Sequence, residues 1–487
     1  MSGSSFSPGQ QCRLNESPII RAVLELAGAA AQEVWLVGGC VRDLVRGEAL
    51  NDVDVALAGA LPFARAFAER TGGTYVPWRT EWGMARVALP GPRIVDFAEL
   101  RGRTIEEDLR ARDLTINALA AAPGPVEGEW QLIDPLGGQE DLAARIIRAA
   151  SRRAFADDPL RVLRAFRFAA QLRGAIEAET LGLIGARAPG LAGVAAERVR
   201  AEMVKLFAAS GTAEQIRVMD EVGVVEALWP EARAMRGVDQ PGFHHLDVWE
   251  HSVATLEELD AVLAELPALY GEDAEELARY LEEGEHRAWL KFAALWHDVA
   301  KPETKTLEGE GRARFFGHAE LGAERVQAML RRLACGQRET GLVTTVIALH
   351  LRPLHMLPRA GVAQLSPRAV RRFCRAAQGH ADGVLLLAVA DTRATRGPLM
   401  APEKYREFVA LHRELRRVRR EALEPVEREA PLLTGQDLIE ELGLEPGPGF
   451  REILEAVAEA RVEGELTTRE EALQFVRERY ASRRGEP

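Results

Sequence analysis

Two aspartates separated by one residue are the first candidates for catalysis in this chain. Asp52 and Asp54 lie in the segment DVDVAL (52–57), whose valines and leucine predict a strand. Because side chains alternate along a strand, both carboxylates would lie on one face, where they could bind a pair of Mg²⁺ ions. One ion would activate a hydroxyl nucleophile, and the other would hold a triphosphate and stabilise the leaving pyrophosphate. Asp96, in the predicted strand 93–98, could add a third carboxylate.

A pair of glycines precedes these acids and could bind the triphosphate. Gly38 and Gly39 end the apolar segment 33–38 and open a helical pattern. Backbone N–H groups at a helix N-terminus favour anions, so phosphates could lie on this turn. Such turns also occur for packing reasons alone, and it is the nearby pair of aspartates that favours nucleotide binding.

A row of charged side chains predicts a surface that recognises a base. Four residues recur at every third position of a predicted helix and would cover one broad face of it: Asp158, Arg161, Arg164 and Arg167. Cytosine and adenine both offer an exocyclic amine, which could donate to Asp158, beside a ring nitrogen, which could accept from Arg161. Guanine and uracil present the reverse pattern, so one protein surface could admit C and A and exclude the other two.

Two histidines and two aspartates in helical segments predict a second metal site. They are His251, the adjacent pair His297 and Asp298, and Asp391. Imidazoles together with carboxylates suit a divalent transition metal better than Mg²⁺ alone. Water bound to such a metal becomes a hydroxide nucleophile near neutral pH, which predicts a hydrolytic reaction.

Short apolar segments between Gly and Pro turns must position the first group of residues. Strands are predicted at 33–38, 52–57, 85–89 and 93–98, with helical patterns such as 62–70 between them. From about residue 138 onward the apolar spacing is helical, with no convincing strand. The expected fold class is multidomain α+β: an N-terminal α/β head with a small mixed sheet and helices, followed by all-α parts.

Length and turn signals predict how the chain is divided. The 487 residues suggest about three domains, and Gly and Pro cluster in loops near 124–130 and 237–243. We expect four parts: a head at 1–152, a helical neck at 153–240, a metal-binding domain at 241–425 and a C-terminal helical region at 426–487.

Composition excludes several classes of protein. The formal net charge of −12 excludes a uniformly basic protein that coats nucleic acid, so an RNA-binding surface must be local. Four cysteines without a CxxC pair predict neither a zinc ribbon nor a disulfide framework. No segment reaches the about 18 apolar residues that a membrane span needs. We therefore expect a cytoplasmic protein without a membrane partner.

The candidate residues also carry a family resemblance. Residues 36–57, LVGGCVRDLVRGEALNDVDVAL, resemble the signature of the class II, bacterial-type tRNA nucleotidyltransferases, which extend tRNA 3′ ends with CCA, and of their poly(A) polymerase relatives. The resemblance continues in order at 107–118, 157–168 and 197–206. The family most often has Glu where Asp157 stands, a departure that concerns only the role of that acid.

The resemblance implies template-independent addition of nucleotides to tRNA from CTP and ATP, with Mg²⁺ in the head and no DNA partner. It assigns contacts with phosphates and sugar to Gly38, Gly39, Arg42 and Arg112. It also implies base recognition by Asp158 and Arg161. Arg164 and Arg167 would face the triphosphate or the neighbouring loop.

The second metal site resembles that of the HD phosphohydrolase superfamily. His318 and His350 fall where HD enzymes with two metals place additional histidines, although a phosphate contact for His318 and a core position for His350 are equally open. Lys301 resembles a residue that many HD proteins place near the scissile phosphate. The implied reaction is hydrolysis of phosphomonoesters or 2′,3′-cyclic phosphates with a divalent transition metal of unknown identity.

Three alternatives remain at this point. The enzyme could add only CC or only A, because a flexible loop that one sequence does not reveal separates these specificities. It could be a poly(A) polymerase, although those relatives usually carry a basic C-terminal extension. The head could also be a non-catalytic module that binds nucleotide or RNA and regulates the HD hydrolase. The oligomeric state is open.

Overall fold

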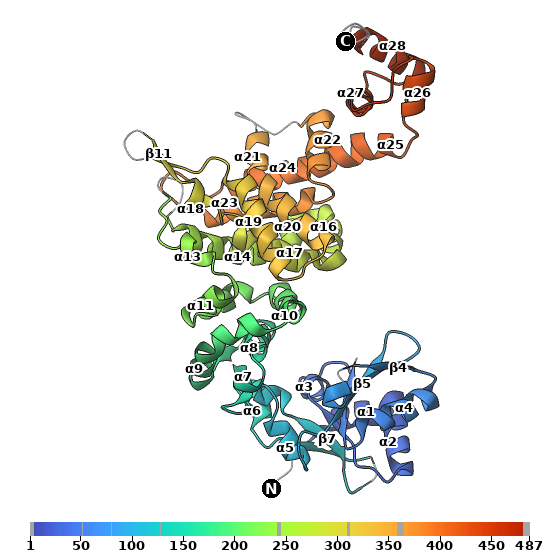
Figure 1. Ribbon diagram of the computed structural model, residues 1–487, viewed down its shortest axis with the longest axis vertical. Coiled ribbons are helices and arrows are strands. Elements are labelled where there is room, and N and C mark those ends of the chain that lie inside the picture. The colour runs from blue at the N-terminus through green and yellow to red at the C-terminus, as the bar shows by residue number, and fades with distance from the viewer. Residues whose placement is uncertain are drawn as a thin grey trace. The chain divides into compact units, whose positions relative to one another are not determined.

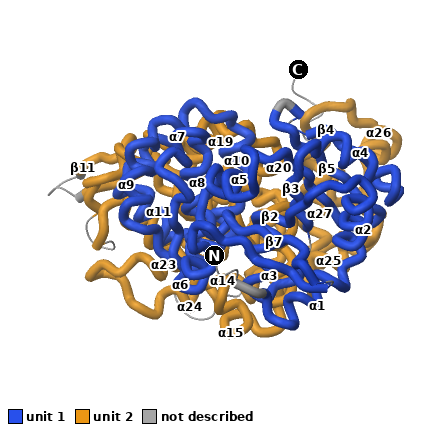
Figure 2. Tube along the Cα trace, turned by 90° about the horizontal axis from the view of Figure 1, so that it is seen from below, with its two compact units in different colours: residues 1–228 blue, residues 229–487 orange. Residues whose placement is uncertain are grey.

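The computed structural model describes residues 4–480 except 51, 79, 127, 241–244, 309–311 and 358–364. It divides into two compact units, residues 1–228 and 229–487 (Figure 2). Each unit is described by itself below. The finer division into four parts remains a prediction.

An eight-stranded mixed sheet forms the framework of the first unit (Figure 1). Its strands, in spatial order, are β1 (Ser4–Ser5), β8 (Trp130–Ile133), β7 (Ala120–Pro123), β2 (Trp35–Val37), β3 (Val53–Leu57), β6 (Ile94–Glu99), β5 (Met84–Ala88) and β4 (Thr74–Pro77). Only β3 and β6 pair in parallel, and their register joins Asp54 to Asp96. The four predicted strands all lie in this sheet, which confirms the α/β head.

One face of the sheet carries the core of the first unit. Helices α2 (Pro18–Ala29) and α4 (Ala60–Thr71) pack on it. Val55, Phe97 and Val87 from three adjacent strands are fully buried there. Because side chains alternate, the polar residues between them are presented on the opposite face.

Further helices of the first unit lie between the strands and after them in the chain. The three that bear on the site are α5 (Ile105–Arg110), α8 (Arg161–Leu172) and α10 (Ala196–Ala208). The rest of the chain is mostly helical, as expected. Two short pairs of strands interrupt it: β9 (Ile146–Ile147) with β10 (Ala175–Ile176), and β11 (Thr306–Glu308) with β12 (Arg312–Arg314). The expectation of no strand beyond residue 138 is wrong for these pairs, because two or three residues are too few to show a period-2 pattern.

A helical bundle forms the centre of the second unit (Figure 1). Its main helices are α14 (Val248–Ala264), α17 (His286–Trp296), α19 (His318–Arg332), α20 (Gln337–Leu349), α23 (Ala381–Ala394) and α24 (Tyr405–Val418). Residues 288–296 of α17 are all buried, as expected for a helix surrounded by others. None of the helices in the described ranges is both long enough and apolar enough to span a bilayer.

The C-terminal helices have a small core of their own. They are α26 (Gly435–Glu440), α27 (Gly449–Val462) and α28 (Arg469–Tyr480). Leu438, Val457 and Val476 are buried between them. Ion pairs join this core to α22 (Pro367–Ala376), including Arg372 Nε to Glu459 Oε1 at 2.7 Å.

Candidate functional sites

Three carboxylates of the sheet come together, as the spacing of the sequence predicts. Asp54 on β3 and Asp96 on β6 are direct neighbours across the parallel pair. Asp52 lies one residue before β3 and is exposed. Burial, followed by repulsion from Asp96, raises the pKa of Asp54 to about 6. Carboxylates this close disfavour ionisation of one another, and a divalent cation between them would relieve the repulsion. These oxygen donors therefore fit Mg²⁺.

The turn before α3 (Gly39–Val45) lies beside this carboxylate group. Gly38 has φ +70°, which favours glycine, and a Cβ atom there would come within 2.8 Å of Arg112 Nη1. A Cβ on Gly39 would lie 3.5 Å from Asp54 Oδ2. The lack of side chains therefore lets the guanidinium of Arg112 and the carboxylate of Asp54 approach the turn. A triphosphate bound there would meet donors and a cation together.

The two arginines predicted to bind phosphate are held by other side chains of the first unit. Arg42 Nη1 donates to Asn117 Oδ1 at 2.7 Å, and its guanidinium lies 4.8 Å from the centre of the Phe168 ring. Arg112 Nε donates to the buried Asp108 at 2.9 Å. Each guanidinium is thus oriented before a ligand arrives, which lowers the entropic cost of binding phosphate.

The structure places the row of charged residues on or just before α8, but it gives their side chains several partners. Arg161 is buried and donates to the carbonyl oxygens of Ala111, Arg112 and Ala154 at 3.1–3.2 Å. Asp158 accepts from Arg198 of α10 at 2.7 Å. Arg161 therefore braces the backbone that carries Arg112, and recognition of a base by Asp158 and Arg161 remains a prediction.

Two buried acids hold the other arginines of α8, and the sequence analysis assigned them no role. Arg164 Nε donates to Asp113 Oδ2 at 2.7 Å. Arg167 Nε lies 2.7 Å from Glu202 Oε2, and Arg167 Cζ lies 3.9 Å from the centre of the Phe168 ring. Burial opposes ionisation of Asp113, but Arg164 outweighs it and lowers the pKa of that carboxyl. Both acids belong to the segments that carry the family resemblance, and this position was the one signal in the sequence that could have marked them as site residues.

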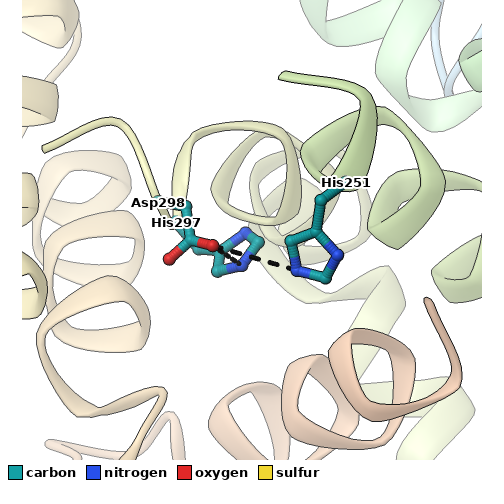
Figure 3. A group of neighbouring side chains, drawn as sticks. All are labelled: His251, His297 and Asp298. Carbon is teal, nitrogen blue, oxygen red and sulfur yellow. Dashed lines mark ion pairs between the residues drawn. The ribbon is translucent and has the colours of Figure 1, made fainter. Parts of the chain in front are cut away.

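The helical bundle of the second unit brings together all the residues predicted for the second metal site. His251 lies on α14, His297 and Asp298 directly follow α17, and Asp391 lies on α23. His251 Nε2 is 2.9 Å from Asp391 Oδ1, and His297 Nε2 is 3.1 Å from Asp298 Oδ2. Figure 3 shows His251, His297 and Asp298 pointing toward one another from two elements.

His318 and His350 join the same cluster from other helices. His318 begins α19 and His350 follows α20. Their Nε2 atoms are 3.3 Å apart, and that of His318 is 3.3 Å from Asp298 Oδ1. Two groups suited to a metal ion result, one of His251, His297 and Asp298, the other of Asp298, His318 and His350. Asp298 belongs to both, so its carboxylate could bridge two ions.

Backbone carbonyls set the protonation of three of these histidines. The Nδ1 atoms of His297, His318 and His350 lie 2.7–2.9 Å from carbonyl oxygens of Ala294, Phe315 and Ile347. A carbonyl only accepts, so Nδ1 carries the hydrogen and each Nε2 presents a lone pair when the ring is neutral. Burial, followed by repulsion from His297, lowers the pKa of His350 to about 3, so that this ring is neutral near pH 7.

The interior of this cluster fits a cation. His297 Nε2 and both carboxylate oxygens of Asp298 are buried without a hydrogen-bond partner. Buried polar atoms of this kind are costly unless a ligand satisfies them. Nitrogen and oxygen donors together match a divalent transition metal better than Mg²⁺.

Gln240 is a residue of this site that the sequence analysis missed. Lys301 is buried, its Nζ atom lies 2.5 Å from Asp298 Oδ2 in an ion pair, and it donates to Gln240 Oε1 at 2.5 Å. Gln240 is 4% exposed, and its Nε2 group is buried without a hydrogen-bond partner. Gln240 lies 61 positions before Lys301 in the sequence, and only the folded chain joins the two.

Four family models match successive segments of the chain. Residues 91–148 match the poly(A) polymerase head domain, and 175–235 match the probable RNA- and SrmB-binding site of polymerase A. Residues 248–390 match the HD domain, and 413–476 match the putative domain 2 of tRNA nucleotidyltransferases.

Relatives match over nearly the whole length. The chain is 36% identical to an A-adding tRNA nucleotidyltransferase of Deinococcus radiodurans, over 91% of this chain and 94% of that protein. It is 33% identical to a CC-adding tRNA nucleotidyltransferase of Thermus thermophilus, over 91% and 93%. A solved CCA-adding enzyme in complex with ATP shares the fold, with a TM-score of 0.64 and 22% identity over 98% of this chain and 99% of that one. This chain belongs to the tRNA nucleotidyltransferase family.

Proposed function

We propose that this enzyme adds part of the CCA sequence to the 3′ end of tRNA, using CTP or ATP with Mg²⁺. The observation that carries the proposal is the in-register pair Asp54 and Asp96, with Asp52 beside it and the Gly38–Gly39 turn next to Asp54. Partial addition is supported by two of the relatives that match over nine tenths of the chain. One is named for adding A and the other for adding CC. Since tRNA is the substrate, the cytoplasm is the proposed place of action.

The chain's own residues bind and orient the reactants. The backbone of the Gly38–Gly39 turn, with Arg42 and Arg112, holds the triphosphate. The tRNA 3′-hydroxyl attacks the α-phosphorus, a new phosphodiester bond forms, and the bond to pyrophosphate breaks. Asp52, Asp54 and Asp96 would hold Mg²⁺, which would lower the pKa of the hydroxyl and neutralise the departing charge. Asp158 and Arg161 select C or A. To contact the base, Arg161 gives up one of its three hydrogen bonds to backbone carbonyls.

We further propose hydrolysis of a phosphate ester at the histidine cluster. Asp298 joins two groups of ligands, and Lys301 lies beside them. The histidines, with Asp298 and Asp391, would hold a divalent transition metal, which would activate water for hydrolysis near neutral pH. Lys301 and Gln240 bind the phosphate, and the substrates are phosphomonoesters or 2′,3′-cyclic phosphates.

The decisive experiment uses three tRNA transcripts that end before CCA, after C and after CC. Each is incubated with Mg²⁺ and labelled CTP, ATP or both, and the products are resolved at single nucleotides. Addition of CC alone or of A alone supports the proposal and decides between its two forms. Complete CCA contradicts partial addition, long A tails indicate a poly(A) polymerase, and no extension in any reaction supports a non-catalytic head.

Matched variants separate the two sites. Asp54→Asn abolishes extension, whereas Glu69→Gln, an exposed acid on α4, serves as the control for loss of one negative charge. His297→Ala abolishes hydrolysis of a model cyclic phosphate, with the exposed His355→Ala as its control. Loss of both activities in either variant would contradict the assignment to separate sites.

A further inference from the structure

A row of side chains crosses four strands of the head, starting at the catalytic carboxylates. The strand pairing aligns Asp54 on β3 with Asp96 on β6, Asp96 with Arg86 on β5, and Arg86 with Val76 on β4. Residues paired in this way lie on the same face of the sheet. This is the face opposite the core, and 37% of the Arg86 side chain and 39% of Val76 are exposed.

An exposed tryptophan lies at the far end of this row. Trp78 directly follows β4 and is 37% exposed. Arg86 lies 4.7 Å from the centre of its ring while binding Asp96 with two hydrogen bonds of 2.7 and 2.8 Å. One arginine thus connects an aromatic ring to a catalytic carboxylate. Five of the eight tryptophans are instead buried in cores: Trp130, Trp229, Trp249, Trp289 and Trp296.

The order of the strands separates two sides of the catalytic group. The Gly38–Gly39 turn follows β2, which neighbours β3 on one side, whereas β6, β5 and β4 follow β3 on the other. In phosphoryl and nucleotidyl transfer the attacking and leaving oxygens lie roughly in line. If the triphosphate lies at the Gly38–Gly39 turn, the attacking hydroxyl must approach over β6 and β5.

We propose that Trp78, oriented by Arg86, is the surface on which an unpaired base at the 3′ end of the RNA stacks. Every base has a ring face that an aromatic side chain can cover, so such a contact tolerates tRNAs of different sequence. The exposed tryptophan, the cation beside it and the direction of approach all favour the RNA end over the base of the incoming nucleotide. The inference rests on the proposed nucleotidyl transfer, because that reaction defines the two sides.

Fluorescence of the RNA tests the stacking directly. The probe is an acceptor-stem RNA whose last unpaired base is 2-aminopurine, bound to the full chain with Mg²⁺ and without nucleoside triphosphate. We expect quenching by the wild-type protein, loss of the quenching in Trp78→Leu with about ten-fold weaker binding, and near wild-type behaviour in Trp78→Phe. Trp82→Leu is the matched control, since Trp82 is 62% exposed on the neighbouring turn.

The outcomes separate this inference from the proposed function. Because no triphosphate is present, the assay reads RNA binding even if nucleotide addition fails. Undiminished quenching in Trp78→Leu, or an equal loss in Trp82→Leu, overturns the assignment to Trp78. Steady-state kinetics give a second test: KM for RNA rises about ten-fold in Trp78→Leu while KM for the nucleotide stays constant, and the opposite pattern would place the incoming base on Trp78.

Discussion

The two candidate metal sites of this chain are built in opposite ways. In the head, Asp54 and Asp96 lie on the face of the sheet opposite α2 and α4, and Asp52, just before β3, is exposed. In the HD domain, four histidines and Asp298 are buried between helices, each less than a tenth exposed. The carboxylates of the head offer only oxygen donors, which suit Mg²⁺, whereas the second cluster adds nitrogen donors that suit transition metals.

This difference matches the size of the substrates. In the head, the exposed Asp52 and the partly exposed side chains of Arg86 and Val76 leave room for an RNA end to approach over several strands. A site buried between helices admits only a small group, such as a terminal phosphate, and excludes water from around the metal. Two reactions of phosphate chemistry thus use different frameworks because one must receive a macromolecule.

The largest expected effect is loss of nucleotide addition without loss of hydrolysis. Asp54→Asn lowers the rate of nucleotide addition by at least about 1,000-fold, because one charged metal ligand is removed. Hydrolysis at the HD domain stays at the wild-type rate. Product analysis on tRNA transcripts and a cyclic-phosphate assay on the same preparation measure both. Retention of addition would remove Asp54 from the metal site.

The reciprocal change is loss of hydrolysis without loss of nucleotide addition. His297→Ala removes hydrolysis and the bound transition metal, because a buried ligand with its lone pair on Nε2 is lost. Nucleotide addition continues. Elemental analysis of purified wild-type protein, of His297→Ala and of His355→Ala gives the metal content independently of activity. Equal metal content in all three would contradict the ligand assignment.

A smaller effect sharpens the role of Gln240. Gln240→Leu removes the acceptor that orients Lys301 and lowers kcat of hydrolysis about ten- to a hundred-fold. The metal content stays unchanged, since the side-chain oxygen of Gln240 accepts from Lys301 and not from a predicted metal ligand. Gln436→Leu, an exposed glutamine on α26, is the control. Loss of the metal in Gln240→Leu would indicate a purely structural role.

The smallest effect concerns pH and stability of the metal-free head. The pKa of Asp54 is raised to about 6 by burial and then by Asp96. Its contribution to stability is therefore fully present below about pH 4, the pKa of an unfolded aspartate, and is lost as pH rises through 6. Asp54→Asn should raise the free energy of unfolding by about 3 kcal/mol at pH 8 in EDTA and leave it unchanged at pH 4.

Calorimetry at the two pH values, with and without Mg²⁺, measures this difference. Mg²⁺ should stabilise the wild-type head at pH 8 and remove most of the advantage of the variant, because the ion replaces repulsion by attraction. Equal stabilisation of Asp54→Asn by Mg²⁺ would show that the ion binds elsewhere.

Much of both sites could be predicted from local patterns. Alternation along 52–57 predicted that Asp52 and Asp54 act together, and the resemblance to HD enzymes predicted that His251, His297 and Asp391 come together. These predictions depend on spacing within one element or on a motif, both of which are visible in the order of residues. Partners far apart in the chain were not predictable in this way, as Gln240 with Lys301 and Arg164 with Asp113 illustrate.

The sequence by itself therefore determined which residues are candidates for the chemistry and which elements hold them. Only the tertiary structure decided how their side chains are engaged: that Arg161 donates to three carbonyls, that Asp298 belongs to two groups of ligands, and that Arg86 joins Asp96 to Trp78. The physical reason is that hydrogen bonds and ion pairs depend on distances of a few ångström. Strand register and helix packing set those distances between residues that lie far apart in the chain.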